Sequence, residues 1–362
     1  MMFGIIEVFF ALALGAMLPS DQPPLDAATV LRGMPADCEF MAFQDLRVID
    51  QRIERYLDLV RGQEWLTANS EWSALIERAD HSLDEYASQA STFLGFDPFT
   101  ELVGVGICAK LSQSSDGEPV PSFQLVLQTV NPIDISSRVG MLDRVDIAGQ
   151  SLPGFREDGM TVGIYSLENA VVVGTSDYLT PLLSASTWAG VPAPDVPHGS
   201  LLGRLNELVP SGVTSYVAVR PSVPTRFLIN SSHAPATFTQ LIAGLDSALA
   251  TTNGQAIHFE LKATDAAVHE DFSLILQGLG HLSEASPLAA EGMIRVMLGI
   301  FSETDPHVDS ELRPFLAHRE EVLSLLDELG FSGQVEATFA EDTTAMLSTL
   351  DINNAQSLVY TY

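Results

Sequence analysis

Two short stretches of the chain repeat one pattern, and this repeat constrains the fold more than any other feature. MPADCEFMAFQDL spans residues 34–46, and VPSGVTSYVAVRP spans residues 209–221. In each stretch a proline opens a turn, and the apolar run that follows is typical of a buried strand. Pro210 aligns with Pro35 at an offset of 210 − 35 = 175 residues. We therefore predict two internally related halves.

The elements that follow the two turns also correspond, although imperfectly. In the first half, apolar residues at helical spacing predict helices over 46–61 and 72–94, and a strand follows over 102–111. In the second half, a single helix over 237–250 precedes a strand over 256–263. The second long helix of the first half has no counterpart, but the order strand, helix, strand is shared.

The remaining pattern completes each half and places a boundary between them. The first half should continue with a strand over 122–130, a helix over 134–145, and strands over 160–166 and 170–175. The second half should add helices in EDFSLILQGLGHL, in LAAEGMIRVMLGIF and over 312–329, and closing strands in QVEATFA and SLVYTY. A linker is indicated by the proline-rich segment TWAGVPAPDVPHG. We divide the chain into a first half over 31–186, a linker and lead-in over 187–204, and a second half over 205–362.

This pattern predicts an α+β fold of mainly antiparallel sheets covered by helices, with two related halves that could share one continuous sheet.

The charge of the chain excludes one class of partner. The chain has 17 Lys and Arg against 47 Asp and Glu, a formal net charge of −30, and its lysines are Lys110 and Lys262 alone. Because such a surface repels phosphates, we expect no nucleic-acid binding.

Residues 3–18, FGIIEVFFALALGAML, form the most apolar window at either end of the chain. This window is short for a membrane span, which needs about 20 residues, and it suits the apolar region of a secretory leader. It departs from the usual leader in having Glu7 inside it and no Lys or Arg before it. We predict a signal peptide over 1–20, export to the periplasm or cell exterior, and no stable membrane span after its removal.

The chain has two cysteines, Cys38 and Cys108, both in predicted strands. In an oxidising compartment they could pair if their Cα atoms come within about 7 Å. We favour two separate buried thiols, because lone cysteines are among the most buried residues. Neither cysteine has the spacing of a zinc site or a redox motif.

Several of these segments together resemble a group of uncharacterised exported bacterial proteins, including many from planctomycetes and myxobacteria. The similarity rests on the P-A-D turn, on GFDPFTELVGVGI, and on GIYSLENAVVVGTSDYLTPLL, which occur here in the same order. It covers most of residues 31–186 and, faintly, residues 205–283. The group has no assigned activity, so the resemblance implies no catalytic residues. It implies a periplasmic or surface location and an α+β fold with two related halves.

One loop has the composition of a cation site. SETDPHVDSE, residues 302–311, places Asp305, His307 and Asp309 at alternate positions, which point the same way in an extended loop. The loop lacks the glycine and the closing glutamate of a calcium loop, so a polar connection between two helices is the competing interpretation. A second candidate is His258 with the run His269-Glu270-Asp271, which could form a metal or acid–base pair if the two segments meet. Histidines in so acidic a chain will also lie near carboxylates by chance.

The sequence contains no catalytic motif and no cofactor fingerprint that we recognise. We therefore expect a non-enzymatic exported protein that binds an unknown protein or envelope component, or that has a structural role. The alternative is a hydrolase or a divalent-cation-dependent module that uses the acidic loop 302–311. A deep pocket lined by histidine and carboxylates would favour the alternative, and an apolar groove or open sheet would favour binding.

Overall fold

The structure of the chain is a computed structural model, and it describes the greater part of both predicted halves. The described residues are 30–31, 33–46, 58–59, 61–68, 73–74, 101–113, 119–132, 142–157, 159–185, 191, 195–196, 200–208, 213–226, 236–253, 256–301, 317–318, 320–321, 324 and 335–354.

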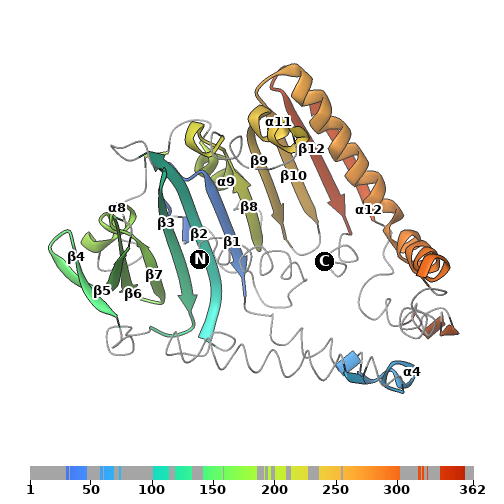
Figure 1. The fold of residues 1–362 in the computed structure, drawn as a ribbon, viewed down its shortest axis with the longest axis horizontal. Coiled ribbons are helices and arrows are strands. Elements are labelled where there is room, and N and C mark those ends of the chain that lie inside the picture. Colours follow the sequence, from blue (N-terminus) through green and yellow to red (C-terminus); the bar gives the residue numbers. More distant parts are fainter. Residues whose placement is uncertain are drawn as a thin grey trace.

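The described strands form a single twelve-stranded sheet in which every neighbouring pair is antiparallel (Figure 1). The strands are β1 (Phe40–Asp45), β2 (Leu102–Gln113), β3 (Pro119–Thr129), β4 (Asp143–Ile147), β5 (Gln150–Glu157), β6 (Met160–Leu167), β7 (Ala170–Thr175), β8 (Ser215–Val219), β9 (Leu245–Thr252), β10 (Ile257–Ala263), β11 (Glu336–Asp342) and β12 (Leu347–Asn353). The prediction of a mainly antiparallel α+β fold is confirmed, and all described strands lie in one continuous sheet.

The order of the strands runs outward from a central pair. The full order is β11-β12-β10-β9-β8-β1-β2-β3-β7-β6-β5-β4. β8 and β1 are adjacent and antiparallel, and from each of them the chain adds two more strands in sequence order, β9 and β10 on one side and β2 and β3 on the other. The two predicted proline-turn strands therefore meet side by side in the middle of the sheet.

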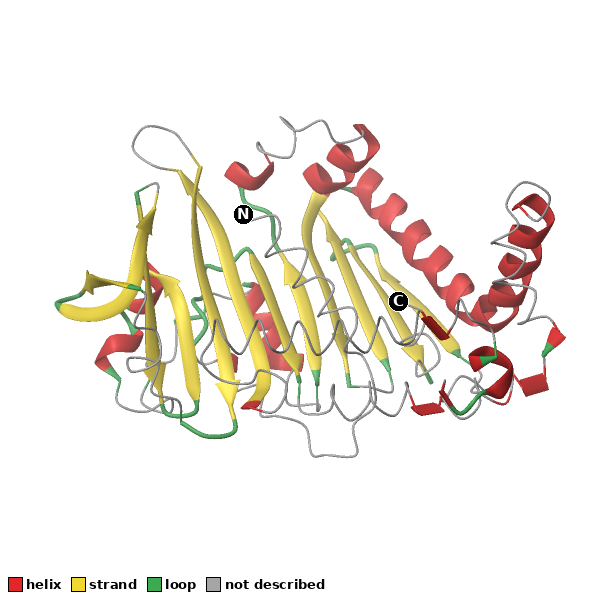
Figure 2. Cartoon of the chain, turned by 60° about the horizontal axis from the view of Figure 1, so that its bottom comes forward, coloured by secondary structure: helices red, strands yellow, loops and turns green. Residues whose placement is uncertain are grey.

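The described helices are α4 (Glu64–Thr67), α8 (Ser176–Leu179), the 3₁₀ turn η1 (Leu182–Ser184), α9 (Leu201–Leu208), α11 (Ala236–Gly244) and α12 (Ala266–Phe301). All of them except α4 pack on the sheet, and they are divided between its two faces. The long helix α12 runs diagonally across β10, β12 and β11 at one end of the sheet (Figures 1 and 2).

The two faces carry different cores. We call the face that bears Met41, Phe43 and Tyr216 the α9 face, because α8, η1 and α9 pack there together with Val30 and Leu31. The opposite face is the α12 face: Phe272 and Leu276 of α12 pack on it against strands β9 to β12. A smaller cluster of apolar residues from β2, β3 and β7 lies on that same face in the first half.

A row of three glycines lets the β4 end of the sheet curl over its own α9 face, as Figure 2 shows. Gly154, Gly163 and Gly174 face one another across β5, β6 and β7. A Cβ on Gly163 would lie 2.7 Å from Ile147 Cδ1 of β4 and 3.1 Å from Leu179 Cδ1 of α8. The glycines therefore leave room for β4 and α8 to pack directly on the sheet, as glycine does where a sheet bends sharply.

Four predicted helices are wrong in their extent. The predicted helix 134–145 runs into β4, which begins at Asp143, and the predicted helix 237–250 ends at Gly244, where β9 begins. In both places strand pairing within the sheet outweighs a helical pattern. The two helices predicted from EDFSLILQGLGHL and LAAEGMIRVMLGIF are instead one continuous helix, α12. Strands β5 and β12 were not predicted.

The strands predicted over 102–111, 122–130, 160–166, 170–175 and 256–263, and in QVEATFA, are confirmed within a few residues. Most residues of the predicted helices 46–61, 72–94 and 312–329 lie outside the described residues, as do the predicted signal peptide, most of the predicted linker, and the strand predicted in SLVYTY.

Candidate functional site

The residues predicted to bind a cation, Asp305, His307 and Asp309, lie outside the described residues, so that site stays a prediction. Among the described residues, no group of three or more His, Cys, Asp or Glu is arranged to hold a metal ion.

The second candidate required His258 to meet the segment His269-Glu270-Asp271, and the two segments do not meet. His258 lies on β10 and contacts Glu260 and Asp351 on the α9 face. His269 lies on α12, on the opposite side of the sheet, where its Nδ1 is 3.4 Å from Glu341 Oε1. The sheet separates the two histidines. The side chain of His258 projects from the α9 face of β10, whereas α12, which carries His269, packs on the opposite face.

His258 belongs to a network of charged side chains that joins one helix to two strands. Its Nε2 lies 2.9 Å from Glu260 Oε1, and its Nδ1 lies 2.7 Å from Asp351 Oδ1. Arg204 of α9 donates two hydrogen bonds to Glu260, of which the one from Nε to Oε2 measures 3.0 Å. Arg204 also donates from Nη1 to Glu207 Oε2 at 2.6 Å. We call Arg204, Glu260, His258 and Asp351 the α9 clamp.

The strand geometry explains how the clamp is assembled. His258 and Glu260 are two positions apart on β10 and therefore project from the same face. Asp351 is the direct cross-strand partner of His258 on β12. Leu201, Leu202 and Leu205 hold α9 against the α9 face of the sheet. This position of the helix brings the Arg204 side chain within hydrogen-bonding distance of Glu260.

The charges of the clamp reinforce one another. Two hydrogen bonds raise the pKa of His258 above its usual 6.5. The bond to Glu260 has the larger effect, and the bond to Asp351 has the smaller one. Burial tends to raise the pKa of Glu260, but hydrogen bonds from His258 and Arg204 outweigh it and lower that pKa to about 2. The same bond to Glu260 raises the pKa of Arg204.

This geometry restricts the chemistry of His258. A carboxylate faces each ring nitrogen, so both nitrogens are donors and the imidazolium form is favoured. A histidine in that form has no lone pair for a metal and no free nitrogen to accept a proton. Because Glu260 is only 8% exposed and is held by two cations, the clamp is suited to hold α9 on the sheet. The spacing His258-x-Glu260 is visible in the sequence, but nothing in the sequence points to Arg204 or Asp351 as their partners.

His269 belongs to a separate polar cluster under α12. Ser273 lies one helical turn after it, and the Ser273 and Ser348 hydroxyls are 2.7 Å apart. His269 Nε2 has no hydrogen-bond partner, although the histidine side chain is only 6% exposed. Both serines are buried, so a substrate cannot reach their hydroxyls, and the cluster lacks the access that a nucleophilic site needs.

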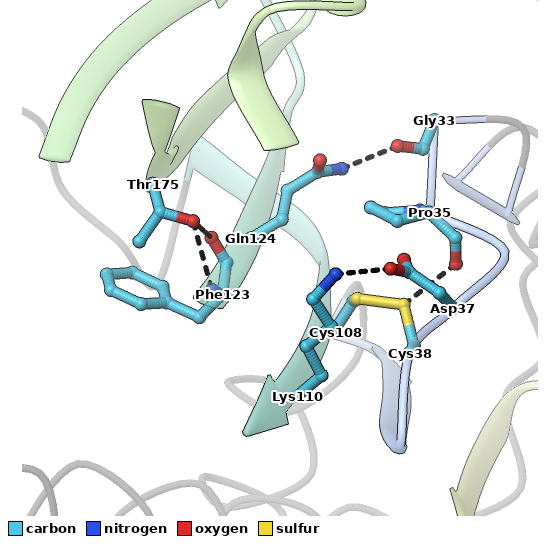
Figure 3. Close-up of a disulfide and its surroundings, with 9 residues drawn as sticks. All are labelled: Gly33, Pro35, Asp37, Cys38, Cys108, Lys110, Phe123, Gln124 and Thr175. Carbon is cyan, nitrogen blue, oxygen red and sulfur yellow. Dashed lines mark hydrogen bonds and ion pairs between the residues drawn. A yellow bond between two sulfur atoms is a disulfide. The ribbon is translucent and has the colours of Figure 1, made fainter. Parts of the chain in front are cut away.

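The two cysteines form a disulfide that joins Cys38, two residues before β1, to Cys108 of β2, with Cα atoms 5.6 Å apart (Figure 3). The expectation of two separate thiols is therefore wrong, because antiparallel pairing brings residues 70 positions apart into contact. Lys110 forms an ion pair with Asp37 beside the bond, and its Nζ lies 5.1 Å from the centre of the Tyr178 ring. Both cysteine side chains are buried, so this is a structural rather than a reactive site.

The outer side of α12 is the largest group of exposed apolar side chains among the described residues. Leu274 and Leu282 are 60% and 65% exposed, and Ile275 and Leu279 are each 41% exposed. These four residues and Gly278 lie on one side of the helix at three- and four-residue steps, and we call them the outer stripe. Phe272, Leu276 and Ser283 on the other side of α12 are buried. A helix that is apolar on the side facing solvent, as well as on the side facing the core, has a surface suited to a partner.

Within the described residues no helix is both long enough and apolar enough to cross a membrane. No protein-family pattern and no curated protein matches the chain. Among solved structures, the chain is similar to one described as the structure of crystal form I of TP0453, with 9% sequence identity and a TM-score of 0.32 over 91% of this chain and 94% of that one. A likeness this low carries no argument about fold or function.

Proposed function

We propose that the protein is a non-enzymatic exported protein that binds a partner through the outer stripe of α12. The observation that carries this proposal is the exposure of four large apolar side chains on one side of a helix whose other side is buried in the core. Scattered apolar residues are normal on a protein surface, but a contiguous row of them is typical of an interaction site.

The arrangement of the histidines supports binding over catalysis. Both nitrogens of His258 are held by carboxylates, and the serines near His269 are buried, so neither histidine is poised to act on a substrate. The hydrolase alternative therefore rests only on the loop 302–311.

Two features support export. A disulfide that links β1 to β2 is compatible with an oxidising compartment. The apolar window at residues 3–18 and the resemblance to exported bacterial proteins point the same way. Mass spectrometry of the protein recovered from cell fractions tests this part of the proposal: a mature chain that lacks about the first 16 to 20 residues is expected, and an uncleaved chain in the cytoplasm would contradict it.

Site-specific photo-crosslinking in cells tests the binding surface. A photoreactive amino acid at Ile275, which is 41% exposed in the outer stripe, should give crosslinked products. The same amino acid at Val223, which is 79% exposed outside the stripe, is the matched control and should give none. The products from position 275 should disappear when Leu274 and Leu282 are both replaced by serine. Equal crosslinking from the two positions would contradict the proposal.

We also propose that the two halves of the sheet arose by internal duplication. β8 begins 215 − 40 = 175 residues after β1, which equals the offset between Pro35 and Pro210. The pair Ala42 and Val217, also 175 residues apart, lies in register at the middle of the β1–β8 pairing. An antiparallel pair that is symmetric about such a residue is the arrangement of a two-fold interface between equal units. The matching order of β1-β2-β3 and β8-β9-β10 supports the same origin.

Exchanging the two residues of this central pair tests the duplication. If their surroundings are equivalent, the double variant Ala42→Val/Val217→Ala should unfold within about 0.5 kcal/mol of the wild type. Each single variant should be less stable, because one underfills and the other overfills the same space. A double variant as unstable as the sum of the two single variants would show that the two positions are not equivalent.

A further inference from the structure

We propose that the outer stripe of α12 binds an amphipathic helix of a partner protein whose apolar side is flanked by lysine or arginine. This inference rests on the proposed function and names the chemistry of the partner.

The shape of the stripe suits a helix. Leu274, Gly278 and Leu282 follow one another at four-residue steps, and Ile275 and Leu279 form a second row beside them. Rows of this kind are the ridges that pack into the grooves of a second helix. Gly278 lies between the two exposed leucines and has no atom within 4 Å of the place a Cβ would occupy. It therefore forms a notch where the backbone of a partner helix can approach closely.

The charges around the stripe are of one sign. Between residues 266 and 285 α12 contains Glu270, Asp271 and Glu284 but no lysine or arginine. All three residues are exposed, and Glu270 and Asp271 lie one turn before the stripe. Glu284 turns toward the sheet instead, where its Oε1 accepts a hydrogen bond from Ala337 N of β11. A partner that covers the leucines therefore places the side chains at one end of its own stripe beside Glu270 and Asp271, and cations there gain favourable electrostatic interactions.

The same charges exclude two other occupants. A second copy of this chain would bring two surfaces of net charge −30 together, and the like charges oppose that association. An anionic bilayer would be repelled for the same reason. A cationic helix is the partner that complements both the apolar row and the acidic end formed by Glu270 and Asp271.

Titration of the full chain with two designed peptides tests this inference. Both peptides are helical with a leucine stripe, and they differ only in having lysine or glutamate beside it. The lysine peptide should bind at least tenfold more tightly, and its affinity should fall as sodium chloride is added. The variant Leu274→Ser/Leu282→Ser should bind the lysine peptide at least tenfold more weakly, since exposed anchors of an interface contribute on this scale.

Further variants test the apolar and the charged contributions to binding separately. Val223→Ser removes an exposed apolar side chain outside the stripe and should bind as the wild type does. Glu270→Gln/Asp271→Asn should bind the lysine peptide more weakly and with a smaller dependence on salt. The circular dichroism and unfolding midpoint of each variant should match the wild type, because the substituted side chains are exposed.

Each contrary outcome has a distinct meaning. If both peptides bind equally and both need Leu274 and Leu282, the charge inference is wrong and the binding surface stands. If neither peptide binds, or the double serine variant binds unchanged, the inference and the proposed function both fail at this surface. If phosphatidylcholine vesicles bind in a stripe-dependent way and the peptides do not, or if the stripe drives dimer formation in light scattering, the partner is a membrane or a second copy and the inference is overturned.

Discussion

The larger cores at the two ends of the sheet lie on opposite faces. Toward β7 the α9 face is apolar and is covered by α8, η1 and α9, and a disulfide lies within its core. Toward β12 the core lies on the other face, under α12, and the α9 face carries charged residues. One sheet can therefore contribute to two cores. The side chains of each strand alternate between the two faces, so helices can cover one face at one end and the other face at the other end.

The change between the two ends can be followed residue by residue. Along one row of the α9 face, Met41, Ala218 and Leu249 on β1, β8 and β9 are followed by Glu260 on β10. The polar character begins at β10, and the α9 clamp lies at this boundary. Arg204 belongs to a helix of the apolar region and binds a carboxylate of the polar region, so the clamp joins the two parts.

The first prediction concerns the disulfide, which only the first half contains. The variant Cys38→Ser/Cys108→Ser should lower the free energy of unfolding by about 4 kcal/mol, because the bond closes a loop with a sequence separation of 70 residues. Urea denaturation of the variant and the wild type measures the difference. In the native wild type, the buried bond should resist mild reductant. A loss below about 1 kcal/mol would mean that this half does not depend on the bond.

The second prediction compares a glycine from each end. Gly154→Ala should destabilise the protein by about 3 kcal/mol, because the new Cβ would lie 2.1 Å from the Val162 carbonyl oxygen, which the sheet holds in place. Gly278→Ala, in the exposed side of α12, should stabilise it by about 1 kcal/mol, since alanine favours a helix and meets no atom there. The urea midpoints should move in opposite directions. Shifts of the same sign would show that the curled end is not tightly packed around its glycines.

The third prediction, with the smallest effect, concerns the clamp between the two ends. The pKa of His258 is raised by folding, so its stabilising contribution is complete below pH 6.5 and is lost as the pH rises through the raised value. The pKa of Glu260 is lowered by folding, so its contribution is complete above pH 4.5 and is lost as the pH falls toward about 2.

The wild type should therefore exceed His258→Gln in stability by about 1 kcal/mol between pH 4.5 and 6.5, and by less on either side of that window. The effect is small because Asp351 is half exposed. Thermal unfolding midpoints of the two proteins across pH, at constant salt, measure it. A difference that does not change with pH would show that His258 acts only through packing.

Local sequence patterns predicted most of the strands, because alternating or continuous apolar runs bounded by turn residues are strong signals. The tight turn at Glu168 is an example, where the residue adopts a φ of 51° between β6 and β7. The sequence predicts that the helix over 237–250 continues past Gly244. Strand β9 forms there because pairing with β8 and β10 outweighs that local preference.

The candidate site was less accessible to prediction from the sequence. His258 and Glu260 could be placed on one face of a strand, but Arg204 is 56 residues away from Glu260 in the chain and Asp351 is 93 residues away from His258. The outer stripe presented a related problem. The spacing of apolar residues in α12 indicates a helix with apolar sides, and it does not tell which side the sheet covers.

The sequence by itself determined most of the antiparallel strands and the acidic composition, because each depends on residues close together or on composition. Only the tertiary structure decided that β1 and β8 pair at the centre of one sheet, that Cys38 and Cys108 are bonded, and that the larger core at each end lies on a different face. The physical reason is that these outcomes depend on contacts between distant segments, and burial is settled by which surfaces meet in the folded chain.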